Sequence, residues 1–187
     1  MDDALARDAV VGAADRLFYG RGIQSVGMDE IRAAAGISLK RMYALFPSKE
    51  TILAEVLRRR NEEWTAGILG AAENQPTAEA KLLSIFDFLS GWFAEDDFRG
   101  CAFINSFGEL GASAPLVADA ARAHKTGFQR YVAQLAADAG APPQLAPQLA
   151  LLAEGAQTTA AISGSPDAAT DARAAAATLL DAALRSA

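Results

Sequence analysis

Three long cationic side chains and one phenol lie close together near residue 40 of this chain. They are Lys40, Arg41 and Lys49, with Tyr43 between them. Ammonium and guanidinium groups bind phosphate, and Arg or Lys in a major groove binds the O6 and N7 atoms of guanine. This group of side chains therefore predicts contact with double-stranded DNA. The alternative is that they are solvated charges on an ordinary surface.

A short helix and a tight turn are expected just before these side chains. In the segment MDEIRAAAGISLKRMYALFPSKETIL, which is residues 28–53, Ile31 and two following alanines keep helical spacing. Gly36 ends this helix, because glycine adopts a left-handed backbone conformation without penalty. Ile37 then returns to the core.

A second helix is expected to begin at Ser38. The hydroxyl oxygen of a serine at this position accepts a hydrogen bond from a backbone amide of the next turn. Leu39, Lys40 and Arg41 are then the first residues of a helix whose N-terminal end faces outward. In a helix-turn-helix, that end enters the major groove of DNA.

The order I-x-x-x-A-G-I-S, followed by a tyrosine and then by F-x-S-K-E, resembles the N-terminal signature of the tetracycline-repressor (TetR) family of transcriptional regulators. The resemblance covers roughly Ala9 to Leu57. Two positions depart from it. Gly27 stands where the family usually has a threonine that caps the second helix, and Leu45 stands where it often has histidine or tyrosine. Both family side chains commonly contact phosphate.

The resemblance implies an all-α protein of about nine helices in two domains. A three-helix, helix-turn-helix DNA-binding domain would comprise residues 1–47, and a helical ligand-binding and dimerisation domain residues 48–187, with helix 48–73 connecting the two. The expected DNA contacts are Ser38, Leu39, Lys40, Arg41, Tyr43 and Lys49. The Tyr43 hydroxyl would bind a phosphate, or the ring would pack against Phe46. Lys49 and the amides that begin the fourth helix favour an anion.

Alanine-rich, apolar-periodic runs separated by glycine and proline predict helices along the whole chain. Besides the pair around the turn, helices are expected at about 4–21, 48–72, from Thr77 onward with an apolar stripe to Phe93, and at 101–110, 115–138, 145–163 and 168–186. The last two are rich in alanine and poor in charge. By resemblance they form half of an intersubunit four-helix bundle, with Leu152, Ala156, Ala160, Leu179 and Ala183 facing the partner. They are otherwise the back wall of the monomer core.

The net charge of -6 is unevenly distributed. Residues 1–60 carry ten Lys and Arg against eight Asp and Glu, whereas residues 61–187 carry seven against fifteen. The cations are thus concentrated where DNA contact is expected, and the acidic remainder repels DNA from the wrong side of the molecule. No apolar run approaches the length of a membrane span, and the start MDDALARD is acidic where a signal peptide is basic, so a cytoplasmic protein is expected.

The larger domain is expected to bind a small apolar or aromatic effector. In the family, the helices from about residue 78 to 138 surround such a cavity, and this chain concentrates aromatic side chains there. The candidate lining residues are Trp92, Phe93, Phe103, Asn105, Phe107, Phe128 and Tyr131. Core packing alone would require the same aromatic side chains. Cys101, Asn105 and Glu109 share one helix face by their spacing and offer a polar edge to the pocket.

The single cysteine excludes an internal disulfide, and the single histidine excludes a histidine metal site, so no cofactor or metal is expected. Cys101 at a helix N-terminus is a candidate redox or electrophile sensor, with an inert buried thiol as the alternative. Cys101 and His124 offer a nucleophile and a base, but no catalytic motif accompanies them, so the chain is not expected to be an enzyme.

These observations together favour a homodimeric repressor that a small effector releases from a palindromic operator. Activation is the less common outcome in the family. The residues are also compatible with a repressor that senses electrophiles through Cys101, and with a helical interaction module that has lost DNA binding at Gly27 and Leu45.

Overall fold

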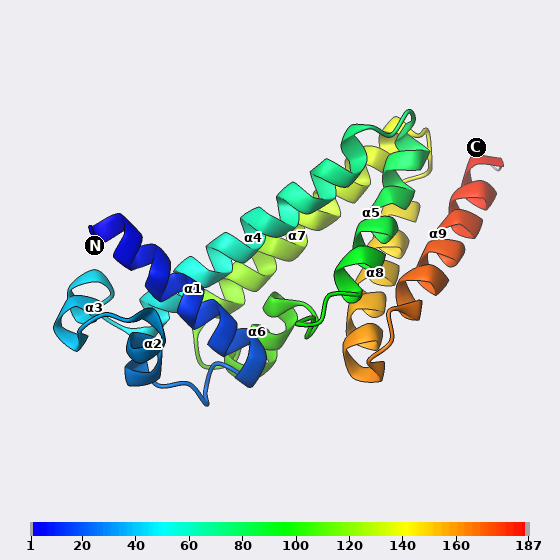
Figure 1. Cartoon of the computed structure of the whole chain (residues 1–187). Helices are drawn as coiled ribbons and strands as arrows, with labels where there is room; N and C mark the ends of the chain where they lie inside the picture. The colour runs from blue at the N-terminus through cyan, green and yellow to red at the C-terminus, as the bar shows by residue number, and fades with distance from the viewer. Residues whose placement is uncertain (1, 186–187) are drawn as a thin grey trace. The chain divides into compact units, whose positions relative to one another are not determined.

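The computed structural model describes residues 2–185, which contain nine α-helices and no strand (Figure 1). The helices are α1 (Asp3–Arg21), α2 (Met28–Ala35), α3 (Leu39–Leu45), α4 (Lys49–Glu73), α5 (Ala78–Phe93), α6 (Ala102–Leu110), α7 (Pro115–Asp138), α8 (Leu145–Ser163) and α9 (Asp167–Arg185). The all-α prediction is confirmed, and the helix bounds agree to within a residue or two. The expected end of the last helix at Ser186 lies outside the described residues.

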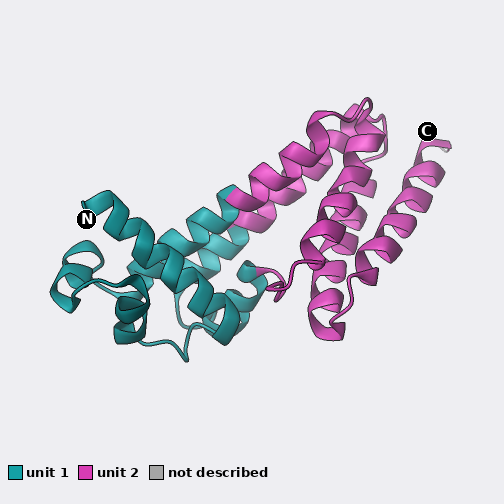
Figure 2. Ribbon diagram, viewed as in Figure 1, with its two compact units in different colours: residues 1–62, 102–122 teal, residues 63–101, 123–187 magenta. Residues whose placement is uncertain are grey.

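The chain divides into two compact units (Figure 2). Unit 1 combines residues 1–62 with residues 102–122, and unit 2 combines residues 63–101 with residues 123–187. Helices α4 and α7 therefore contribute to both units. This division reflects packing, while the expected boundary after residue 47 concerns function, so the assignment of residues 1–47 to DNA binding stays a prediction.

The core of unit 1 is built on one face of α1. Val10 and Phe18 of this helix are buried, as the helical spacing predicts, and Ile31 of α2 and Met42 of α3 are completely buried within the same unit. Asp2 caps α1, because its carboxylate oxygen accepts the Leu5 amide at 2.8 Å. The three helices thus share one apolar core that fixes their mutual orientation.

Unit 2 is a helical layer of α5, α8 and α9. The predicted stripe of α5 is buried, and Leu82, Phe86 and Leu89 are each at most 1% exposed. Alanines of α8 and α9 fill the space against it, including Ala153 and Ala176 at 0% exposure. Small side chains allow the helix axes to approach closely, so a core with few large residues is still well packed.

Helix α8 presents a different face to the outside than we expected. Ala156 and Ala160 are 5% and 2% exposed, because they pack inside unit 2, and so the expectation that they face a partner subunit is wrong. The exposed positions of α8 include Gln148, Leu151, Gly155, Thr158 and Ile162, which recur every three or four residues and carry no charge.

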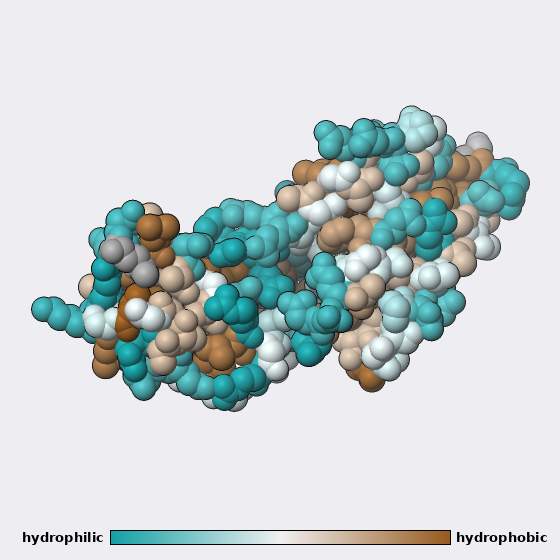
Figure 3. Space-filling view, in the orientation of Figure 1, coloured by the Kyte–Doolittle hydropathy of each residue, from teal (hydrophilic) through white to brown (hydrophobic). Residues whose placement is uncertain are grey.

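The described surface is mixed in character. Figure 3 shows apolar residues interspersed with hydrophilic ones over both units. The most exposed large apolar side chains are Leu151 and Ile162 of α8, at 70% and 83%. None of the described helices combines the length and the apolar character that crossing a membrane would require.

Two glycines of α4 allow a matched test of packing within unit 2. A Cβ atom at Gly67 would overlap the Phe88 ring, whereas one at Gly70 would meet nothing within 4 Å. We expect Gly67→Ala to lower the free energy of unfolding by about 1–3 kcal/mol through overpacking. Gly70→Ala should raise it by about 0.5–1 kcal/mol, because alanine has the higher helix propensity. Urea unfolding measures both, and equal effects of the two variants would contradict the close contact.

Candidate nucleic-acid interface

The turn between α2 and α3 has the geometry that its sequence predicts. Gly36 has a φ of 67° and its amide donates to the Ala33 carbonyl oxygen at 3.2 Å. The Ile37 amide donates to the Arg32 carbonyl oxygen at 3.3 Å, and the Ile37 side chain is buried. The left-handed glycine reverses the chain, and the buried isoleucine anchors the reversal to the core.

The beginning of α2 replaces the usual capping side chain with an interaction from the next turn. Gly27 offers no side-chain oxygen, but its amide donates to Oε2 of Glu30 at 3.5 Å. The Arg21 guanidinium also binds Glu30, and this hydrogen bond, together with the weaker one from Gly27, lowers the pKa of the Glu30 carboxyl. Half of a capping box therefore remains at this helix start.

The first turn of α3 is exposed, and Met42 with the following Phe46 holds the helix to the core. Oγ of Ser38 accepts the Arg41 amide at 3.2 Å, as expected of the cap. Ser38, Leu39 and Lys40 are exposed, and Met42 and Phe46 are almost completely buried. The N-terminal end of this helix thus projects from unit 1, and the buried Met42 and Phe46 hold the helix to the core.

Arg41 and Tyr43 differ in their surroundings. Nη2 of Arg41 lies 3.0 Å from Oδ1 of Asp3 on α1, so the guanidinium forms an ion pair within unit 1. The Tyr43 side chain is 48% exposed. No sequence pattern indicates the Asp3 partner, because it lies 38 residues away.

Lys49 lies at the N-terminus of α4, where Ser48 and Thr51 cap each other. The Thr51 amide donates to Oγ of Ser48 and the Ser48 amide to Oγ1 of Thr51, both at 3.3 Å. These two amides are therefore not open to an anion. The Lys49 ammonium lies 5.8 Å from the centre of the Phe18 ring and borders a surface hollow of about 350 Å³. Lys49 is thus the cationic donor at this helix end.

Arg7 is a positioning residue that the sequence does not predict. Its Nη1 donates to the Leu45 carbonyl oxygen at 2.8 Å, and its guanidinium lies 4.3 Å from the centre of the Phe46 ring. Arg7 therefore satisfies a carbonyl group at the C-terminal end of α3 and ties this helix to α1. No local pattern distinguishes it from a solvated arginine.

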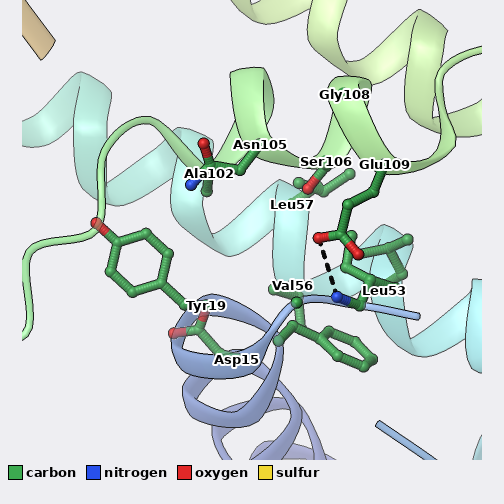
Figure 4. Close-up of a pocket in the computed structure, with 13 residues that line it drawn as sticks. Asp15, Tyr19, Leu53, Val56, Leu57, Ala102, Asn105, Ser106, Gly108 and Glu109 are labelled. Atoms are coloured by element: carbon green, nitrogen blue, oxygen red, sulfur yellow. Dashed lines mark hydrogen bonds between the residues drawn. The ribbon is translucent and has the colours of Figure 1, made fainter. Parts of the chain in front are cut away.

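Helix α6 is joined to the loop that leads into α2. The Glu109 carboxylate accepts the backbone amide of Ile23 at 3.0 Å, drawn as the dashed line in Figure 4. It also accepts the amide of Gln24 at 3.1 Å. Nε2 of Gln24 donates in return to the Glu109 carbonyl oxygen at 3.0 Å. Three hydrogen bonds thus fix the loop and α6 to each other within unit 1. Helical spacing predicts Glu109 at a pocket edge but carries no signal of this loop partner.

The candidate effector residues fall into both units. Phe103, Asn105 and Phe107 belong to unit 1, where Phe103 is buried and Phe107 is 49% exposed. The others, Trp92, Phe93, Phe128 and Tyr131, belong to unit 2. Cys101 is a free thiol with 5% exposure, and the guanidinium of Arg99 donates to the Phe98 carbonyl oxygen at 2.7 Å.

Trp64 is the centre of an aromatic cluster in unit 2 and is not among the predicted lining residues. Its ring centre lies 5.4 Å from those of Phe88 and Trp92 and 5.9 Å from that of Phe128, in edge-to-face arrangements. Its buried Nε1 atom has no hydrogen-bond partner in the described part of the chain. An unpartnered indole N–H among apolar rings is costly, and a hydrogen-bond acceptor of a ligand would satisfy it.

His124 also packs against Trp64, with 5.7 Å between the ring centres. The side chain is 7% exposed. Burial, with a smaller contribution from the Lys125 ammonium, lowers the pKa of His124 to about 4. The imidazole is therefore neutral at pH 7.

Comparison with known proteins places these features in one class, that of all-helical regulators with an N-terminal helix-turn-helix. The profile of the family described as bacterial regulatory proteins, tetR family, matches residues 10–56. The crystal structure of SCO4454, a TetR-family transcriptional regulator from Streptomyces coelicolor, superposes with a TM-score of 0.89 at 26% identity and covers 96% of both chains. The crystal structure of a tetr-transcriptional regulator (sav143) from Streptomyces avermitilis superposes with a TM-score of 0.84 at 30% identity. The match covers 95% of this chain and 97% of that one.

Similarity to curated proteins is confined to part of the chain. The HTH-type transcriptional activator FasR of Mycolicibacterium smegmatis is 32% identical over 102 residues, which are 52% of this chain and 44% of FasR. The matched part of this chain thus spans less than half the length of that relative. With the full-length structural matches, these similarities show that the chain belongs to the TetR family of transcriptional regulators, which is not a family of enzymes.

His124 gives a testable pH dependence. Its folded-state pKa near 4 lies below the unfolded value of 6.5, so its stabilising contribution is present above pH 6.5 and is lost as the pH falls toward 4. Between pH 7 and 4.5 the wild type should therefore lose about 2–3 kcal/mol more stability than His124→Gln. Urea unfolding at both pH values gives the difference. An NMR titration of this single histidine with a midpoint near 6.5 would contradict the assigned environment.

Proposed function

We propose that this protein is a homodimeric DNA-binding regulator that inserts the first turn of α3 into the major groove. The observation that carries the proposal is the exposure of Ser38, Leu39 and Lys40 at the N-terminal end of α3, while Met42 and Phe46 hold the helix in the core. Lys40 and Arg41 then reach base edges or phosphates, and Tyr43 and Lys49 bind the flanking backbone.

The geometry of a two-fold dimer implies the form of the operator. Two copies of α3 related by two-fold symmetry recognise a pseudo-palindrome, with half-site centres about one helical turn (~34–36 Å) apart or somewhat more. We propose repression as the outcome, by occupation of a promoter. FasR bears the name of an activator, so activation is the alternative. A promoter fusion carrying the selected operator distinguishes the two by the sign of the response.

Dimerisation is proposed to use the outward face of α8 together with α9. Leu151, Gly155 and Ile162 lie on a stripe without charge, and apolar side chains exposed in this way are stabilised when a second copy covers them. Gly155 lies at the middle of the stripe, and nothing lies within 4 Å of the position of its missing Cβ. A partner helix can therefore approach closely there.

The effector is proposed to be a small, mostly apolar or aromatic molecule that binds next to the aromatic cluster of unit 2. Trp92, Phe93, Phe128 and Tyr131 supply apolar surface, and the unpartnered Trp64 Nε1 supplies one donor. Such a molecule regulates DNA binding only if it prefers the conformation that binds DNA poorly. The buried thiol of Cys101 gives no specific support to electrophile sensing.

The assignment of DNA contacts is tested on a duplex that the wild type selects from a random-sequence library. Lys49→Ala should weaken binding to selected and random DNA alike and lower the salt slope by about 1, because it removes a phosphate contact. Arg41→Ala should instead relax base preference by about 1–3 kcal/mol at one position per half-site. Arg130→Ala, which removes an exposed arginine of unit 2, is the control and should bind as the wild type does.

Two outcomes would contradict these assignments. Equal losses for Arg41→Ala on selected and random duplexes would show that Arg41 reads no base. Failure of the wild type to enrich any sequence would favour the interaction module that has lost DNA binding, to which Gly27 and Leu45 point.

The dimer interface is tested by a charge at the centre of the α8 stripe. Gly155→Glu should give monomers, because association would desolvate an unpaired carboxylate. Gly127→Glu on α7, where a Cβ atom also meets nothing within 4 Å, is the matched control and should remain dimeric. Sedimentation equilibrium measures both. An unchanged dimer for Gly155→Glu would place the interface elsewhere.

The effector class is tested by fluorescence, because both tryptophans of the chain lie in the unit 2 cluster. An apolar aromatic compound that acts as effector should change tryptophan emission and release selected DNA over the same concentration range. Trp64→Phe should weaken the binding of this compound by about 0.5–1.5 kcal/mol if the indole N–H donates a hydrogen bond to it. If polar metabolites released DNA and apolar compounds did not, the proposal of an apolar or aromatic effector would be contradicted.

A further inference from the structure

A cavity lies wholly within unit 1 and shares no residue with the aromatic cluster. It has a volume of about 320 Å³, and α1, α4 and α6 form its walls (Figure 4). Phe18, Leu53, Val56 and Leu57 supply apolar surface. This volume is at the lower end of the range of about 300–1,000 Å³ that small-molecule sites occupy.

The polar side of this cavity carries a negative charge without a cation to balance it. The Glu109 carboxylate lines the cavity and is held by the amides of Ile23 and Gln24, and it forms no ion pair with any described Lys or Arg. The other carboxylate of the wall, that of Asp15, is already paired with the Arg60 guanidinium at 2.7 Å. Two neutral amides fix the Glu109 carboxylate in place but leave its full charge facing the cavity.

A serine hydroxyl that bonds to none of the described residues lies one helical turn from this carboxylate. Ser106 lines the cavity at 6% exposure, and its side chain makes no hydrogen bond to the part of the chain that the structure describes. Because Ser106 lines the cavity, its hydroxyl is available there to a ligand donor or acceptor. Ser106 and Glu109 both come from α6 and both face the space shown in Figure 4.

A carboxylate fixed by main-chain amides, an unpaired hydroxyl and an apolar wall together define the chemistry of a ligand. From these groups we infer that the cavity binds a small organic monocation, such as a primary ammonium group on a short aromatic or aliphatic body. The ammonium donates to Glu109 and to Ser106, and the body packs against Phe18, Val56 and Leu57. The Tyr19 ring, over which the Arg60 guanidinium lies at 4.2 Å, closes one side of the cavity. A neutral ligand of the same shape keeps the apolar contacts but loses the charge-assisted hydrogen bond.

The site is tested by direct binding without DNA, so the outcome does not depend on the regulatory function. The probe is 2-phenylethylamine, protonated at pH 7, compared with neutral 2-phenylethanol in calorimetric titrations. The amine should bind about tenfold or more tightly than the alcohol, and Glu109→Gln should remove this preference, because a charge-assisted hydrogen bond is lost. Ser106→Ala, which removes no existing hydrogen bond, should lower the affinity for the amine about threefold or more. Asp119→Asn removes an exposed carboxylate of the same unit and should leave binding unchanged.

The location is tested by the amide signals of Ile23 and Gln24 in NMR spectra, since both amides bind the carboxylate that receives the ammonium. They should shift on addition of the amine and stay in place with the alcohol at equal concentration. Equal affinities for amine and alcohol, or an unchanged amine affinity in both Glu109→Gln and Ser106→Ala, would overturn the proposal. If Glu109→Gln disturbs the loop at Ile23 and Gln24, Ser106→Ala still tests the site, because Ser106 does not bind this loop.

Discussion

The burial of Ile31, Ile37 and Met42 in the core of unit 1 is the constraint on which the orientation of α3 depends. A helix of only seven residues is not stable by itself, so its direction is set by what it buries. With Met42 inward, helical periodicity places Lys40 on the outer face, whereas Ser38 and Leu39 are exposed because they lie at the N-terminal end of the helix, beyond the core. The left-handed conformation of Gly36 turns the chain back after α2. Without this turn the chain would leave the core, and Ile37 and Met42 could not both be buried in it.

Local signals are sufficient to predict the helices. Helix caps, left-handed glycines and prolines act within four residues, so Ser38, Ser48 and Gly164 mark helix ends that the structure confirms. Contacts between distant parts of the sequence leave no such signal. The hydrogen bond from Arg7 to Leu45 joins residues 38 apart, and that from Ile23 to Glu109 joins residues 86 apart. Neither partner looks different from a solvated charge until the fold brings them together.

The faces of α8 show a second limit of periodicity. Spacing shows which residues share a face, but where both faces are small and apolar it does not show which one is inward. Ala156 and Ala160 on the buried face and Leu151 and Gly155 on the exposed face carry no charge, so hydropathy does not distinguish them. On α5 the distinction is clear, because Asp87 interrupts one side of the helix while Leu82 and Phe86 continue the other.

Charge pairing within unit 1 limits what its basic residues contribute to DNA binding. Arg41, Arg7 and Arg59 are paired with Asp3, Glu55 and Asp8 respectively, so much of the positive charge of this unit is already balanced. Exposed pairs of this kind contribute only about 0–1 kcal/mol each, so phosphate can replace a carboxylate partner at small cost. The exchange releases fewer counterions than an unpaired arginine would, because the carboxylate remains nearby. Lys40 has no ion-pair partner among the described residues and therefore contributes more than Arg41 to nonspecific attraction of DNA. Arg41 contributes mainly where a base edge binds its guanidinium more strongly than Asp3 does.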